Sequence, residues 1–109
     1  MNWQETVPTS IKVGYRTYSV SLMDHWESTD KQAFGRCDNN GGRIELDAHM
    51  DAPKAANTLL HELMHAVWYV WGMDRKVEEE PAVTIMSNGL TTIMRDNPAF
   101  GEWTRECLA

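Results

Sequence analysis

The chain has 109 residues, of which 42% are hydrophobic and 24% are charged, and its formal net charge is −6. These values predict a single soluble globular domain over residues 1–109, because the chain is too short for two domains and too apolar for disorder. The acidic balance argues against a nucleic-acid partner, and no apolar run is long enough to make the membrane a partner.

The strand-rich part of the chain is expected over residues 10–47. Residues with β-branched and aromatic side chains partly alternate with polar ones over 11–23, and a slip in this alternation indicates a turn or bulge at residues 16–17. Residues 33–37 and 43–47 flank a run of Asp, Asn and Gly that is typical of a tight hairpin turn. We therefore expect an α+β fold in which a small N-terminal antiparallel sheet packs on helices.

Residues 51–109 are predicted to be helical. Asp51 is a suitable N-cap for a helix that runs to about Trp71, and Gly72 is suited to ending that helix. Apolar residues cover much of the circumference of this helix, which indicates a central and largely buried element with Trp68 in the core.

A second helix is predicted from the acidic run Glu78–Glu80 to about Arg95. The link between the two helices is short, so we expect them to pack nearly antiparallel, with the acidic run close to the first helix. The tail after Pro98 carries Phe100 and Trp103, and it is expected to fold back on the core as a short helix.

The segment His61-Glu62-Leu63-Met64-His65 carries the chemistry of the sequence. Histidines four residues apart lie on one face of a helix, where both imidazoles can bind one tetrahedral zinc ion. Glu62 points about 100° around the helix from His61, so it can act as a general base without being a ligand. The alternative is that His61 and His65 are structural histidines with no metal.

A catalytic zinc site needs a third protein ligand and one open position. The candidates are the remaining histidines and nearby carboxylates: His25, Asp47, His49, Asp74 and the acidic run. We favour Glu80, with Glu79 as the alternative, because Glu80 shares a stripe of the second helix with the small residue Ser87. The competing interpretation is that the acidic run is only an exposed helix start.

The segment from Thr58 to Ala66 resembles the zincin motif, and with a downstream Glu it is similar to the gluzincin arrangement of two His and one Glu. More narrowly, the order of elements over residues 10–98 resembles short phage and prophage metallopeptidases related to ImmA/IrrE-like proteins. This resemblance implies a minimal zincin-like domain, with the sheet packed on a central motif helix and a second, Glu-bearing helix.

The resemblance also implies roles for individual residues. His61 and His65 would bind Zn²⁺, Glu80 would complete the ligand set, and Glu62 would be the general base of a zinc-dependent metalloendopeptidase. Thr84 stands where the relatives commonly carry an Asp that orients a ligand. The strand at residues 43–47 would be the edge strand to which an extended peptide or protein substrate pairs.

An alternative function is a non-catalytic zincin-fold module that binds or regulates a partner and keeps zinc for structure. No signal peptide is evident, so a cytoplasmic location is expected, which the resemblance would make that of a phage-infected or lysogenic bacterium. Cys37 and Cys107 are expected to be free thiols in that compartment, and Cys37 could approach the zinc as an inhibitory thiolate.

Overall fold

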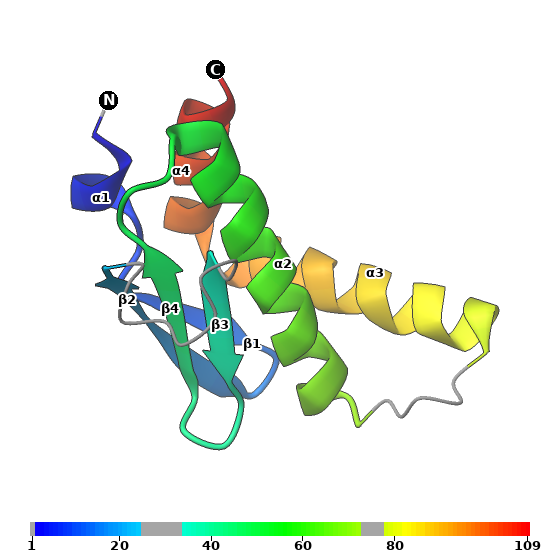
Figure 1. The fold of residues 1–109 in the computed structure, drawn as a ribbon. Helices are drawn as coiled ribbons and strands as arrows, with labels where there is room; N and C mark the ends of the chain where they lie inside the picture. The colour runs from blue at the N-terminus through cyan, green and yellow to red at the C-terminus, as the bar shows by residue number, and fades with distance from the viewer. Residues whose placement is uncertain (1, 25–33, 73–77) are drawn as a thin grey trace.

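The structure is a computed structural model that describes residues 2–24, 34–72 and 78–109 (Figure 1). In chain order the elements are α1 (Trp3–Thr6), β1 (Ser10–Val13), β2 (Arg16–Met23), β3 (Gly35–Asp38), β4 (Arg43–Asp47), α2 (Ala52–Val70), α3 (Glu79–Asp96) and α4 (Pro98–Leu108). The predicted α+β class is confirmed, since the sheet comes from the first half of the chain and the long helices come from the second.

The four strands form one sheet in the order β1-β2-β4-β3. The hairpins β1–β2 and β3–β4 are antiparallel, but β2 and β4 run parallel, so the sheet is mixed and the prediction of an antiparallel sheet is wrong. The second hairpin joins the first through β4, which leaves β3 at the outer edge. A sequence pattern of two hairpins does not show which strand of the second hairpin will meet the first.

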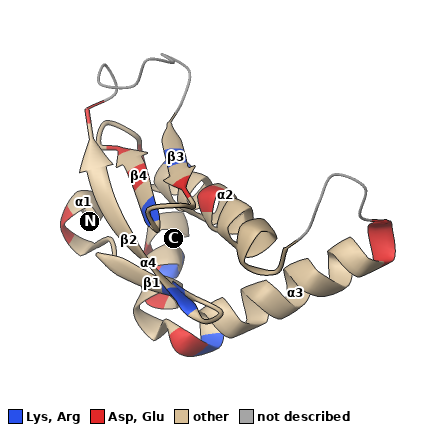
Figure 2. Cartoon of the chain, turned by 90° about the horizontal axis from the view of Figure 1, so that it is seen from below, with Lys and Arg blue, Asp and Glu red and all other residues tan. Residues whose placement is uncertain are grey.

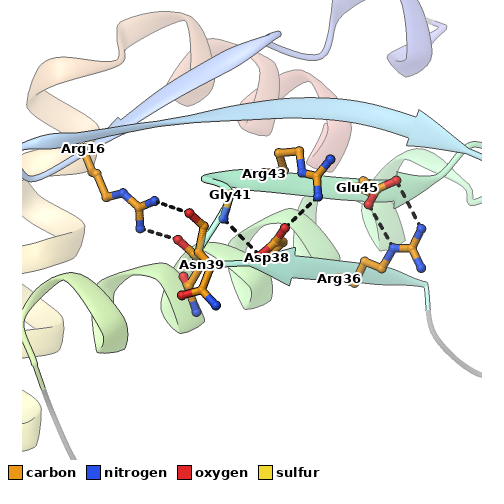
Figure 3. A network of polar contacts seen from close by, with 8 residues as sticks. Arg16, Arg36, Asp38, Asn39, Gly41, Arg43 and Glu45 are labelled. Atoms are coloured by element: carbon orange, nitrogen blue, oxygen red, sulfur yellow. Dashed lines mark hydrogen bonds and ion pairs between the residues drawn. The ribbon is translucent and has the colours of Figure 1, made fainter.

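The strand β4 is internal, and the prediction that residues 43–47 form an edge strand is also wrong. Glu45 lies opposite Ser21 of β2 on one side and opposite Arg36 of β3 on the other. Arg36 and Glu45 form an ion pair across the hairpin, with Nε and Oε1 3.0 Å apart (Figure 3). Among the described strands, those at the edges of the sheet are therefore β1 and β3.

Glycines with positive φ shape the two hairpin turns. Gly14 has φ +62°, a conformation that only glycine adopts at little cost, and it places the first turn just before residues 16–17 rather than on them. Gly42 has φ +66° in the second turn. That hairpin is confirmed, with its first strand at Gly35–Asp38, and the predicted start at residue 33 lies outside the described residues.

A polar network fixes the β3–β4 turn (Figure 3). The Asp38 carboxylate accepts hydrogen bonds from Gly41 N at 3.1 Å and from Arg43 Nη2 at 2.8 Å. The hydrogen bond from Arg43 holds the pKa of Asp38 below its usual range. Arg16 of β2 donates to the carbonyl oxygen of Asn39, so the network also ties this turn to the neighbouring hairpin.

The helix α2 begins and ends as predicted. The Asp51 Oδ1 accepts a hydrogen bond from Lys54 N at 2.9 Å, and Gly72, with φ +69°, follows the last turn. The buried residues of α2 are Ala55, Ala56, Leu59, Glu62, Leu63, Ala66 and Val67. They pack on a buried face of the sheet that includes Ile11, Val13, Ile44 and Leu46. Glu62 is the one charged residue in the buried set of α2.

The C-terminal helix α4 folds back on the core, as predicted. It buries Phe100, Trp103 and Cys107. The Trp103 ring meets the Trp3 ring edge-on, with centroids 6.2 Å apart, and the Trp3 Nε1 donates to the Met50 carbonyl oxygen at 2.7 Å. Residues close to both ends of the chain therefore complete the same core.

The helix α3 contacts α2 through only part of its length. Its buried residues are Gly89 and Ile93, and a Cβ on Gly89 would lie 2.5 Å from Val67 Cγ1 of α2. The first turns of α3 lie away from α2 in both views (Figures 1 and 2). The prediction that the acidic run lies close to the first helix is wrong, because α3 approaches α2 at Gly89, in the second half of α3.

Replacing Gly89 with Ala should destabilise the protein. The added methyl group would overlap the Val67 side chain, and we expect a loss of roughly 1–3 kcal/mol in the free energy of unfolding, measured by urea denaturation. Gly101→Ala is the matched control, because its Cβ would meet only the flexible end of Met94 at 3.3 Å. Alanine should be neutral or stabilising there, by up to about 1 kcal/mol. Equal stability of the two variants would contradict the close crossing.

Candidate metal centre

The side chains of His61 and His65 meet on the exposed face of α2. The helix buries the face that carries Leu59 and Leu63, so residues 61 and 65 are turned to solvent. Their Nε2 atoms are 3.2 Å apart, and their rings meet edge-on with centroids 4.9 Å apart. The two imidazoles therefore point toward a common position, as the spacing predicts.

This separation fits two positions of a zinc site. Two nitrogens at about 2.0–2.1 Å from one tetrahedral metal lie about 3.3 Å from each other. The same separation also suits an N–H···N hydrogen bond between the rings, with one Nε2 as donor and the other as acceptor. The arrangement of the histidine pair alone is thus compatible with a metal ligand pair and with a metal-free pair.

Glu62 lies at the boundary between the histidine face and the core. Glu62 is 7% exposed, and this burial raises the pKa of its carboxyl, while electrostatic interactions with His61 and His65 lower it by less. A carboxylate with a raised pKa is a better proton acceptor than a fully solvated one. The position of Glu62 beside the histidines agrees with the role of a general base.

A cleft of about 330 Å³ opens beside Glu62, between α2 and the start of β3. The residues that line it are Phe34, Gly35, Lys54, Asn57, Thr58, His61 and Glu62. Gly35 lets the strand come this close, because a Cβ there would lie 2.8 Å from Thr58 Cγ2 and 3.3 Å from Glu62 Cγ. Sequence reasoning did not identify Gly35, and its place at the start of a hairpin strand was the one available signal.

A second cleft, of about 430 Å³, lies on the other side of the histidine pair. It is lined by His61, Met64, His65, Trp68 and Met86. Trp68 was predicted to be a core residue, but its side chain is 37% exposed, because it shares the solvent face of α2 with His61 and His65. The spacing 61, 64, 65 and 68 is the sequence signal for this shared face.

The predicted third ligand does not join the pair in this structure. Glu79 and Glu80 are exposed at the start of α3, and Figure 2 shows this acidic end away from α2. Within residues 2–24, 34–72 and 78–109, no group of three or more His, Cys, Asp or Glu side chains could hold a metal ion. Glu80, with Glu79 as the alternative, therefore stays a prediction.

The other candidates for the third ligand are distributed as follows. Asp47 is buried, and its Oδ1 accepts a hydrogen bond from His49 N at 2.9 Å. The His49 Nε2 is 3.1 Å from Asp24 Oδ1. These contacts engage Asp47 and His49 away from the histidine pair. His25 and Asp74 lie outside the described residues.

Comparisons with known proteins add nothing to this geometry. A scan against protein-family models and searches of curated proteins and solved structures found no match. In the part of the chain that the structure describes, no helix is long and apolar enough to cross a membrane. The case for a function therefore depends on the site itself.

Cys37 is a half-buried thiol on β3, and both cysteines are free, as predicted. Its Sγ lies 3.3 Å from Asn39 Oδ1. Burial, together with the negative charges of Glu62 and Asp38, raises the pKa of the Cys37 thiol to about 11. A thiol with this pKa is neutral at pH 7, so a metal would have to displace its proton before Cys37 could bind as an inhibitory thiolate.

We expect Cys37 to react slowly with iodoacetamide in the folded protein. At pH 8.5 the rate should be on the order of tens of times below that of the urea-unfolded chain, because far less thiolate is present. The rate should rise as the pH approaches 11. Peptide mapping by mass spectrometry separates Cys37 from Cys107. A folded-state labelling rate that levels off near pH 9, as for a solvated thiol, would contradict the raised pKa.

Proposed function

We propose that this protein is a zinc-dependent metallopeptidase in which His61 and His65 bind the metal and Glu62 is the general base. The observation that carries the proposal is the convergence of the two Nε2 atoms, 3.2 Å apart, beside a buried carboxylate. Two imidazoles and an adjacent carboxylate at the junction of two clefts suit the hydrolysis of a peptide bond.

Glu62 would move the proton during hydrolysis. When bound, zinc supplies a Lewis acid that polarises a carbonyl group and lowers the pKa of water. The Glu62 carboxylate would accept a proton from the attacking water and later deliver it to the leaving amine. Its burial, which raises its pKa, supports both halves of this role, since the group must bind and then release the same proton.

The edge strand β3 is the element best placed to hold an extended peptide. In the described sheet β3 pairs with β4 alone, and Gly35 at its start lines the cleft beside Glu62. Backbone groups at a free edge can pair with an added strand. We therefore assign to β3 the role that the sequence had suggested for residues 43–47.

The helical phase of α3 favours Glu79 over Glu80 as third ligand. Met86 lines the apolar cleft together with His61 and His65. Glu79 lies seven residues before Met86, about two turns away and on the same face, whereas Glu80 points about 120° to the side. For either carboxylate to reach the pair, the first turns of α3 would have to move toward α2.

We include in this proposal the resemblance of the sequence to zincins and to ImmA/IrrE-like phage and prophage metallopeptidases. One observation favours the second candidate function, a non-catalytic zincin-fold module: the described residues bring no third ligand to the histidine pair. Such a module would bind a peptide or protein partner in the same clefts without cleaving it. The two candidates differ in what the Glu62 carboxylate does.

Three substitutions test the hydrolase proposal. Glu62→Gln should keep one zinc per chain and the parent stability but lower peptide hydrolysis by about 10²–10⁴-fold, because it removes only the general base. His61→Ala and His65→Ala should lose the zinc, because each removes a ligand. Zinc is measured by elemental analysis, and hydrolysis is measured with a quenched fluorescent peptide library.

His49→Ala is the control, because His49 lies near Asp24 rather than in the histidine pair, and it should keep the zinc. A zinc-loaded parent that cleaves no peptide, or a Glu62→Gln variant that cleaves as fast as the parent, would exclude the hydrolase and favour the binding module. If neither His61→Ala nor His65→Ala lowered the zinc content, both the hydrolase and the zinc-containing binding module would be excluded.

The third ligand can be identified by zinc affinity. We expect Glu79→Ala to weaken zinc binding by at least about tenfold, since a ligand is lost, while Glu80→Ala binds zinc as the parent does. Both variants remove one exposed acidic residue from the same turn, so each controls for the change in net charge. Competition with a chromophoric chelator measures the affinity. If only Glu80→Ala lowered the zinc affinity, Glu80 would be the third ligand, as the sequence had suggested.

A further inference from the structure

The exposed face of α2 is polar before His61 and apolar after it. Before His61 the exposed stripe carries the polar residues Lys54, Asn57 and Thr58, which line the cleft beside β3. After it the stripe carries Met64 and Trp68, which line the apolar cleft. His61 lines both clefts, so they form two halves of one surface that meet at the histidine pair.

The polar half carries a positive charge. Among the described residues that line this cleft, Lys54 is the only lysine or arginine. Its Nζ lies 3.3 Å from the centre of the Phe34 ring, a cation–π contact that holds the ammonium group at the mouth of the cleft. This ammonium group can pair with a negative group on an incoming peptide, whereas the Glu62 carboxylate in the same cleft would repel one.

The apolar half is suited to a large aliphatic or aromatic side chain. Met64, Trp68 and Met86 form its walls, and Met86 comes from α3, so the cleft lies between the two helices. Methionine side chains adapt to ligands of different shape, and an exposed tryptophan ring provides a broad apolar contact. A charged group among Met64, Trp68 and Met86 would lose hydration without gaining an ionic partner from these three side chains.

The spacing along α2 sets the distance between the two selected side chains. Lys54 and Trp68 are each seven residues from His61, which is about 10 Å along a helix. An extended peptide covers about 3.3 Å per residue. Each half therefore spans about three residues of a peptide lying over the histidine pair.

We propose that the two clefts select a peptide that carries an acidic side chain on one side of the histidine pair and a large apolar side chain on the other. The inference rests on the proposed function for the assignment of the ligand as a peptide. Lys54 would be the residue that selects for charge, and Met64, Trp68 and Met86 would form the site for the apolar side chain.

Binding to the zinc-supplemented Glu62→Gln protein tests this inference without relying on cleavage. The probes are short glycine–serine peptides that carry one aspartate and one leucine about six positions apart, made in both chain directions. Matched peptides replace the aspartate with lysine or the leucine with serine. Titrations followed by heteronuclear NMR give each Kd and identify the backbone amides that shift.

Charge reversal at Lys54 should reverse the order of the peptides. We expect the aspartate peptide to bind about fivefold more tightly than its lysine counterpart, and Lys54→Glu to prefer the lysine peptide. A glutamate at this place in the first turn of α2 suits the helix, so folding should be unaffected. Lys12→Glu, which makes the same change of charge on β1, should keep the parent order.

Removing the apolar wall should affect the leucine peptide alone. We expect Met86→Ser to weaken leucine-peptide binding by about tenfold, because less apolar surface is buried, and to leave the serine peptide unchanged. Met94→Ser is the matched control, since Met94 is an exposed methionine of the same helix outside the clefts.

The inference would be overturned if Lys54→Glu bound the aspartate and lysine peptides in the same order of affinity as the parent. So would a failure of both aspartate–leucine peptides to shift amides that line the clefts. These outcomes are separate from those of the proposed function. Selective binding by a parent protein that cleaves nothing would support the inference and defeat the hydrolase, whereas unselective cleavage would do the reverse.

Discussion

Burial of one face of α2 against the mixed sheet is the constraint on which the candidate site depends. Leu59 and Leu63 are fully buried, and side chains of this size each stabilise the fold by about 1.5–3 kcal/mol. Together they outweigh the cost of partly desolvating one carboxylate, which is of the order of a few kcal/mol. The rotation of α2 is therefore set by its apolar residues. Glu62, next to Leu63, is drawn to the edge of the core, while His61 is turned to solvent.

Two close approaches of backbone then build the surroundings of the histidines. Gly35 allows β3 to lie against Thr58 and Glu62, which forms the polar cleft and buries the carboxylate. Gly89 allows α3 to cross α2 at Val67, which brings Met86 over the pair and forms the apolar cleft. A side chain at either glycine would move a whole element rather than one contact. The environment of the histidine pair is thus a consequence of backbone packing as much as of the residues that line it.

The sequence predicted local features of the structure correctly, whereas it did not predict features that depend on long-range packing. The cap at Asp51, the stop at Gly72 and the i, i+4 pair depend on residues close in sequence, and each is found where the pattern indicates. The parallel pairing of β2 with β4 joins segments whose register is set by packing, which no local pattern encodes. Trp68 was misplaced for a related reason: hydrophobicity around the whole helix did not show which side the sheet would cover.

Whether a third protein ligand reaches the histidine pair depends on α3 rather than on α2. Before Gly89 this helix has no buried residue, so its first turns are held by few apolar contacts and moving them costs little. A zinc ion bound by protein ligands can contribute about 10 kcal/mol or more to a small domain. That value is for a complete ligand set, and one carboxylate would supply only part of it. A carboxylate whose loss weakens zinc binding about tenfold contributes about 1.4 kcal/mol, which is enough to shift α3 only if moving its first turns costs less. A metal-dependent position of α3 would therefore be consistent with the fold described here, whereas the core that fixes α2 would stay as it is.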